Sequence, residues 1–200
     1  MRGSRRIAAA AAVALGLAAG GRGQEAKKAP SEAAIAAALE KAMTPGPAQK
    51  KLQFMVGTFD VKIRTWPTPT DPPIEDTAVM VADWVLGGRY IQMMLSGTVV
   101  GQPYSGIGYA GFDNTLQKYV STFMDTGSTG MEWYTGGFDA SGTKAVLKAS
   151  VANPVTGKPS PLEMRLTVDA AGNHVTELWG MGLGTTMFRL MELTYTKRAS

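Results

Sequence analysis

The stretch Leu162-Glu163-Met164-Arg165-Leu166-Thr167-Val168-Asp169 decides the fold class. Apolar and polar side chains alternate along it, so its four apolar residues share one face. Strict alternation is typical of a β-strand with one buried side. The turn residues Ala170-Ala171-Gly172-Asn173 follow, and another run of strand-forming residues begins beyond them. The stretch therefore predicts a β-hairpin.

Similar runs, rich in Val, Thr, Tyr, Phe, Trp and Met, extend from Thr58 to near the C-terminus, with Gly, Pro, Asn and Asp between them. Short strands at this spacing predict an antiparallel barrel or sandwich. A parallel sheet would need helical crossovers, for which the intervals leave no room. The predicted strands cover residues 58–66, 77–86, 89–99, 104–112, 118–126, 129–138, 143–151, 160–168, 173–183 and 186–197.

Gly111-Phe112-Asp113 and Gly137-Phe138-Asp139 repeat the same three residues at two predicted strand ends. Their spacing equals about two strands with their turns, which favours an up-and-down order and places both copies at one end of the sheet. We interpret the two aspartates as turn residues rather than catalytic ones, because Asp side chains accept backbone hydrogen bonds in turns.

The residues before the strands predict two short helices. Ser31 can cap a helix over 32–43, and Thr44-Pro45-Gly46-Pro47 breaks it. Pro47 suits the first turn of a second helix, which would direct Leu52, Met55 and Val56 toward a core before Gly57 ends it.

Residues 1–23 read as a secretory signal: a basic start, an uncharged run from Ile7 to Ala19, and small residues after it. The run is too short to span a bilayer. Ser4-Arg5-Arg6 only faintly resembles a twin-arginine signal. We expect an exported protein, periplasmic or secreted, without a transmembrane segment in its mature chain.

Charge and composition exclude several classes of function. The formal charge is +4, but the signal holds four arginines and no acidic residue, so 16 basic and 16 acidic residues remain from Gln24 onward. A neutral chain without a basic stripe is not expected to bind nucleic acid. The absence of cysteine excludes disulfides, thiol nucleophiles and cysteine metal sites.

Several short motifs resemble a known family when taken in order. Val56-Gly57-Thr58-Phe59-Asp60-Val61 resembles the Gly-x-Trp first strand of the calycin superfamily. The whole series is similar to family 1579 of the bacterial domains of unknown function, over about residues 46–198. The other motifs are Leu86-Gly87-Gly88-Arg89-Tyr90, Gly106 to Asn114, Lys118 to Thr122, Asp125 to Gly130 and Met191 to Arg198.

The resemblance implies a lipocalin-like closed barrel, often exported, with no settled activity. Phe59 and Gln49 depart from the expected Trp and His, so no histidine-based role is expected at position 49. We therefore predict an all-β fold: a roughly ten-stranded antiparallel up-and-down lipocalin-like barrel with one or two short N-terminal helices. The expected segments are the signal (1–23), a flexible leader and helix (24–45) and the barrel (46–200).

A barrel of this size can enclose one small ligand. Methionines and aromatics suit an adaptable apolar pocket with a few placed polar groups. The same residues also fit a plain core or, for the charged ones, the surface. The candidate ligand-binding residues are Trp84, Tyr90, Met94, Tyr109, Phe123, Asp125, Trp133, Glu177, Trp179, Arg189, Met191 and Glu192.

His174 is the sole histidine. Nitrobindins, a related group of barrels, use a histidine near the C-terminal strands to ligate haem, but the turn before His174 favours an exposed residue, so we disfavour haem. No second His or Cys could support a metal site. Ser121 or Ser128 could pair with His174, but no nucleophile-elbow motif accompanies either of them.

Three functions remain open from the sequence. The first is binding of a small, largely apolar ligand inside the barrel. The second is an envelope interaction module with a solid core, which would bind through its N-terminal helix or the proline-rich segment 66–73. The third, an enzyme using Asp125, Glu132 or Glu192 as acid or base, has no motif behind it, and no catalytic residue is assigned. A cavity below about 300 Å³ would argue against carriage of a small molecule.

Overall fold

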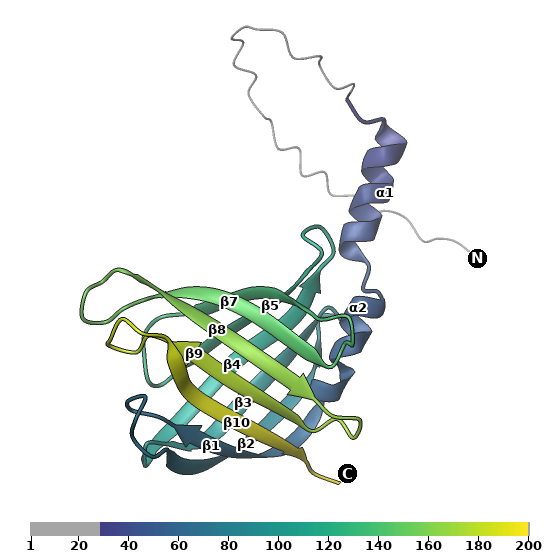
Figure 1. Ribbon diagram of the computed structural model, residues 1–200. Helices are drawn as coiled ribbons and strands as arrows, with labels where there is room; N and C mark the ends of the chain where they lie inside the picture. The colour runs from purple at the N-terminus through teal and green to yellow at the C-terminus, as the bar shows by residue number, and fades with distance from the viewer. Residues whose placement is uncertain (1–28, 200) are drawn as a thin grey trace, which may run out of the picture.

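The computed structural model describes residues 29–199 and contains a closed ten-stranded barrel (Figure 1). Each strand pairs antiparallel with its sequence neighbours, and β10 pairs with β1 to close the sheet. The predicted all-β up-and-down barrel is confirmed, and the sandwich is excluded. The strands are β1 (Gly57–Thr65), β2 (Ile74–Val85), β3 (Tyr90–Val99), β4 (Gln102–Asp113), β5 (Lys118–Asp125), β6 (Glu132–Phe138), β7 (Lys144–Ala152), β8 (Pro159–Val168), β9 (His174–Gly180) and β10 (Phe188–Lys197).

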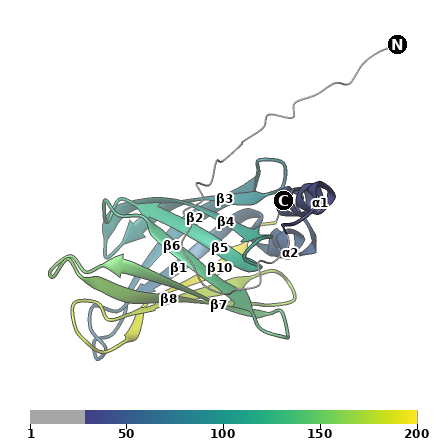
Figure 2. The ribbon, with the colours of Figure 1, turned by 90° about the horizontal axis from the view of Figure 1, so that it is seen from above.

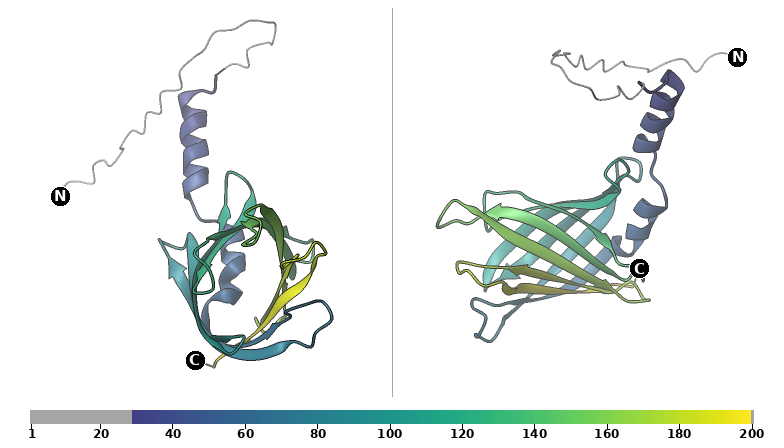
Figure 3. Two further views of the ribbon diagram at one scale, coloured as in Figure 1. Left: turned by 90° about the vertical axis from the view of Figure 1, so that its left-hand side faces the viewer. Right: turned by 45° about the horizontal axis from the view of Figure 1, so that its top comes forward.

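The core lies inside the barrel because alternate residues of each strand point inward. On β1, Phe59, Val61 and Ile63 are at most 1% exposed, whereas Asp60 and Lys62 between them are exposed. Neighbouring strands approach so closely at Gly136 that a Cβ there would overlap the carbonyl oxygen of Val146. Figure 3 (left) looks along the barrel.

One end of the barrel is closed by α2 (Pro47–Lys50) and the 3₁₀ helix η1 (Lys51–Met55). The predicted second helix thus exists, split into an α-turn and a 3₁₀ segment. Gln49 ties it to the sheet: its Nε2 donates to the carbonyl oxygen of Phe112 at 3.1 Å, and its Oε1 accepts from the backbone N–H of Gly46 at 2.7 Å. Gln49 is buried, and both the nitrogen and the oxygen of its side-chain amide form hydrogen bonds that hold the helix against the sheet.

The repeated Gly-Phe-Asp motifs meet at this same end, as predicted. The ring of Tyr119 lies between Phe112 and Phe138, with both centroid distances at 4.9 Å. The side chains of Asp113 and Asp139 accept backbone N–H groups of their turns. Both aspartates therefore serve as turn residues.

Helix α1 (Glu32–Met43) matches the predicted bounds and projects from the barrel (Figures 1 and 2). Ser31 caps it through its hydroxyl, and none of its residues is buried. Its C-terminal end is held by Asn114, whose Nδ2 donates to the carbonyl oxygens of Lys41 at 2.9 Å and Thr44 at 2.8 Å. None of the described helices has the length and apolar character to cross a bilayer. The expected signal, residues 1–23, lies outside the described residues.

Candidate functional site

A cavity of about 200 Å³ lies inside the barrel. Methionines contribute much of its wall: four come from strands, and Met55 comes from η1 at the closed end. Since an unbranched thioether adapts to irregular shapes, such a wall can adjust to more than one occupant. The lining residues are Met55, Ile63, Met80, Met93, Leu95, Val99, Tyr104, Ser121, Phe123, Asp125, Glu132, Met164, His174, Thr176, Leu178, Met191, Leu193 and Tyr195.

Two carboxylates form the negatively charged part of the cavity, near the end opposite α2. Asp125 is the last residue of β5 and Glu132 the first of β6, and the pairing of Phe123 with Glu132 brings them onto one inward face. Tyr104 donates its hydroxyl to Asp125 Oδ2 at 2.7 Å, and Tyr134 donates to Glu132 Oε2 at 2.6 Å. Strands β4, β5 and β6 therefore hold two acid–phenol pairs.

The electrostatics of these pairs follow from burial. Loss of water raises the pKa of Glu132, and the negative charge of Asp125 raises it further, although the hydrogen bond from Tyr134 acts in the opposite direction. Burial and the adjacent carboxylates also raise the pKa of Tyr104 and Tyr134, so both phenols remain donors at neutral pH. Among residues 29–199, no lysine or arginine lines the cavity.

His174 is buried rather than exposed, with 3% of its surface accessible, and this corrects the sequence-based interpretation. Its ring stacks on Tyr195 at a centroid distance of 4.3 Å and meets the edges of Phe54 and Phe59. Burial lowers the pKa of His174 to about 4, so the imidazole is neutral at pH 7. The closing of the barrel end by η1, which brings Phe54 over the ring, produces this burial.

The residues around His174 do not fit a haem. A porphyrin is at least drug-sized, and drug-sized ligands occupy pockets of roughly 300–1,000 Å³, more than the 200 Å³ present. One face of the imidazole is also covered by Tyr195. Within residues 29–199, no group of three or more His, Asp or Glu side chains could hold a metal ion.

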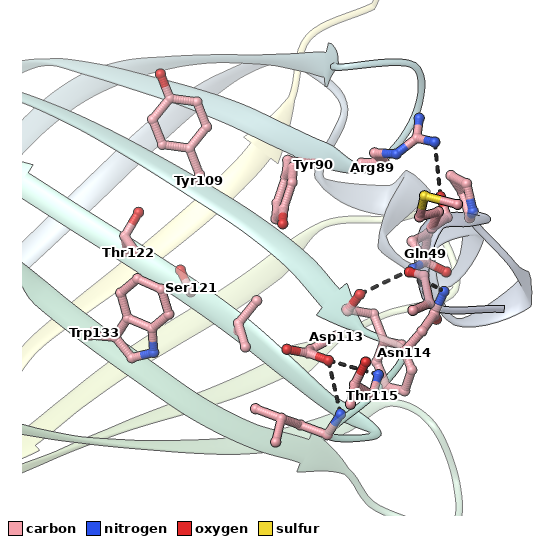
Figure 4. A pocket seen from close by; sticks show the side chains of 16 residues that line it. Gln49, Arg89, Tyr90, Tyr109, Asp113, Asn114, Thr115, Ser121, Thr122 and Trp133 are labelled. Atoms are coloured by element: carbon pink, nitrogen blue, oxygen red, sulfur yellow. Dashed lines mark hydrogen bonds between the residues drawn. The ribbon is translucent and has the colours of Figure 1, made fainter. Parts of the chain in front are cut away.

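A second concavity, of about 360 Å³, lies on the outside between the barrel and the end of α1 (Figure 4). Tyr90, Tyr109 and Trp133 line it, and Trp133 is 59% exposed. Arg89 reaches the same groove and donates to the carbonyl oxygen of Met43 at 2.8 Å. The sequence predicted these aromatics for the interior, but the structure places them on the outer face of β3, β4 and β6.

An ion-pair cluster covers the outer face of β1, β9 and β10. Arg189 Nη1 lies 2.7 Å from Glu177 Oε1 and 2.6 Å from Glu192 Oε2. The predicted pairing of Glu177 with Arg189 and the partial burial of Glu192 are present, but both lie outside the barrel. Trp179 donates its indole N–H to Glu177, and Arg64 bonds Glu192 from β1.

The twelve sequence-predicted ligand residues thus fall into separate places. Phe123, Asp125 and Met191 line the interior cavity. Three line the outer groove: Tyr90, Tyr109 and Trp133. Four belong to the outer ion-pair cluster: Glu177, Trp179, Arg189 and Glu192. Of the remaining two, Trp84 donates its indole N–H to Gln53 Oε1 near the closed end, and Met94 is half exposed on the outside.

The twelve candidates leave out several residues that line the cavity, among them Tyr104 and Glu132, and they also leave out Tyr134, which donates to Glu132. A usable signal exists in the hairpin: Tyr119, Ser121, Phe123 and Asp125 alternate, and residues of β6 that face them must share the interior. Ser121 pairs with Tyr134, and Phe123 pairs with Glu132. This register, which one strand alone does not show, identifies the residues of β6 that face inward.

Comparison with curated protein sequences yields no match. Among solved structures, the chain is similar to the crystal structure of Rv2717c from M. tuberculosis, with a TM-score of 0.59 and 16% sequence identity over 78% of this chain and 100% of that one. An identity this low supports a shared fold only. The family described as protein of unknown function (DUF1579) matches residues 44–197. The chain therefore belongs to the DUF1579 family, as its ordered motifs predicted.

Proposed function

We propose that this protein is an exported barrel that binds a small, largely apolar ligand in its interior. The observation that carries the proposal is the cavity of about 200 Å³, with an adaptable wall of methionines and a polar end formed by Asp125 and Glu132. Ligand sites commonly combine apolar walls with a few convergent polar groups.

The size of the cavity restricts the ligand. Its volume of about 200 Å³ lies below the roughly 300 Å³ limit set from the sequence, which counts against carriage of drug-sized molecules. A long-chain lipid or pigment does not fit. An apolar cavity of about 150 Å³ nevertheless holds a benzene molecule. The proposed ligand is therefore a single-ring or short-chain compound.

Export is the second half of the proposal and rests on the sequence. Residues 1–23 combine a basic start with a short apolar run, and the chain has no cysteine that an oxidising compartment could crosslink. Mass spectrometry of the protein recovered from the bacterial periplasm tests export, since the proposal predicts a mature N-terminus near Gln24. Recovery of uncleaved chain in the cytoplasm would contradict it.

Binding is tested by filling the cavity. Leu178→Trp places a larger side chain in the cavity wall, whereas Val175→Trp makes the same addition at a residue of β9 that points outward. A panel of single-ring compounds should raise the melting temperature of the wild type and the Val175 variant but not of the Leu178 variant. No shift in any of the three proteins, together with native mass spectra free of bound ligand, would refute the proposal.

A protein-interaction module remains the second candidate function because α1 exposes a stripe of apolar side chains. Ile35, Leu39 and Met43 form a stripe along α1 and are 46%, 57% and 62% exposed. A twelve-residue helix is marginal in water unless it packs against something. Ile35→Asp with Leu39→Asp should abolish partner binding if α1 is the binding element, while leaving ligand binding intact.

A further inference from the structure

The interior cavity has an imbalance of charge. Asp125 and Glu132 line it, whereas no lysine or arginine of the described part of the chain does, and His174 is neutral at pH 7. Neither carboxylate forms a salt bridge with any described residue, although Glu163, Glu177 and Glu192 on the outer face all do. Both side chains are half-buried, and a carboxylate withdrawn from water is stabilised by a cationic partner.

The two carboxylates differ in how far the protein satisfies them. Asp125 accepts from the Tyr104 hydroxyl at 2.7 Å and from the backbone N–H of Gly127 at 2.8 Å, one bond on each oxygen. Glu132 accepts only from Tyr134, through Oε2. Its Oε1 has no hydrogen-bond partner among residues 29–199. Glu132 therefore retains an acceptor for a donor that enters the cavity.

We propose that the ligand is a small organic ammonium ion with an apolar body, whose nitrogen donates to Glu132 while its body lies against the methionine wall. This assignment rests on the proposed function, because it names the class of ligand for the same cavity. An ammonium supplies both the donor and the positive charge that the lining lacks, and hydrogen bonds between ionised partners are about twice as strong as neutral ones.

The aromatic residues beside the carboxylates suit the same ligand. Phe123 pairs directly with Glu132 across β5 and β6, so its ring and the carboxylate share the inward face. Tyr104, bonded to Asp125, lines the cavity too. A cation within about 6 Å of such ring faces gains further attraction. An anionic ligand would instead meet two like charges.

Binding of an ammonium is coupled to protonation of Glu132. The titratable groups around this carboxylate are Asp125 on β5, Tyr104 on β4 and Tyr134 on the same strand, β6. His174 and Tyr195 lie elsewhere on the wall. Burial and Asp125 raise the pKa of Glu132 in the free protein. A bound cation favours the ionised form, so affinity should rise with pH through the pKa of Glu132, and binding below it should release a proton.

The test compares three probes that share a phenyl ring: phenethylammonium, its uncharged isostere n-propylbenzene, and phenylacetate. Titration calorimetry at pH 7.5 on the full mature chain gives the three dissociation constants. We expect phenethylammonium to bind about tenfold more tightly than propylbenzene and phenylacetate to bind least.

Glu132→Gln keeps the size of the side chain and an acceptor for Tyr134 while removing the charge, so it should abolish the preference for the ammonium. Glu75→Gln removes the same charge from an outer carboxylate that is 77% exposed and should leave the preference unchanged. Circular dichroism of both variants checks folding.

The outcomes separate this assignment from the proposed function. Equal or tighter binding of propylbenzene to the wild type would overturn the ammonium assignment and leave a ligand-binding barrel. A preference that survives in the Glu132 variant, or that is lost in the Glu75 variant, would also overturn it. No binding of any probe, confirmed by unchanged melting temperatures, would overturn both.

Discussion

Acidification should destabilise the protein through His174, the sole histidine of the chain. Its ring is stacked on Tyr195 and lies 5.3 Å from Phe54 and 5.2 Å from Phe59, measured between centroids. Its nearest polar partner is the carbonyl oxygen of Gly172, 3.4 Å from Nδ1. The folded protein therefore resists protonation of this ring.

The magnitude follows from the two pKa values. Burial lowers the pKa of His174 from its ordinary 6.5 to about 4 in the folded protein. The unfolded chain takes up a proton near pH 6.5 and the folded protein only near pH 4, so the stability present above pH 6.5 is lost as the pH falls through this window. At about 1.36 kcal/mol per pKa unit, the loss is about 3 kcal/mol.

Urea unfolding of the wild type and of His174→Phe, each from pH 7.5 to pH 4, measures this loss. Phe suits the aromatic surroundings and does not titrate. The free energy of unfolding of the variant, relative to that of the wild type, should therefore rise by about 3 kcal/mol as the pH falls through the window. NMR titration of the single imidazole provides the direct value. An imidazole pKa near 6.5, or a difference between the two proteins that does not change with pH, would refute the reasoning.

Three further perturbations test other parts of the structure. Glu132→Gln should raise the melting temperature at pH 7, because it removes a charge from the barrel interior. The gain should vanish below pH 4.5, where the wild-type carboxyl is protonated in both the folded and the unfolded protein, and a gain independent of pH would contradict this. Gly136→Ala should lower the free energy of unfolding by at least about 2 kcal/mol, because its Cβ overlaps the Val146 carbonyl, and an unchanged urea midpoint would contradict the close approach. Asn114→Ala should speed hydrogen exchange in residues 32–44, because Nδ2 no longer holds the end of α1. It should lower the melting temperature of the barrel only slightly, through loss of the bond from Gln49 Nε2 to Asn114 Oδ1. Unchanged exchange would show that other contacts hold α1.

The strands could be predicted because alternation is a local property. In the stretch Leu162 to Val168, the sequence alone assigns each side chain to a face, and β8 has that pattern. The outward placement of Arg189 could not be predicted in this way. A bulge in β10 between Arg189 and Met191 reverses the alternation there, so Met191 points inward while Arg189 points outward to Glu177 and Glu192. Nothing in the local sequence marks that extra residue.

The candidate site shows the same division. Asp125 and Phe123 continue an alternating strand and were among the twelve candidates. Glu132 was considered from the sequence only as a possible acid or base, because its place on the inward face depends on register with the partner strand. Burial of His174 depends on Phe54, which is 120 residues away in sequence and packs on its ring at a distance of 5.3 Å. Contacts between distant segments, rather than local pattern, therefore determine which polar residues are buried.

Methyl NMR of the protein labelled at methionine tests the central claim of an interior binding cavity most directly. Titration with toluene should give saturable shifts of the methyl signals of Met80, Met93 and Met164, which line the cavity. The signals of Met94 and Met131, which are 50% and 58% exposed, should remain unchanged. Shifts that do not saturate, or that affect exposed and interior methionines alike, would contradict a binding cavity inside this barrel.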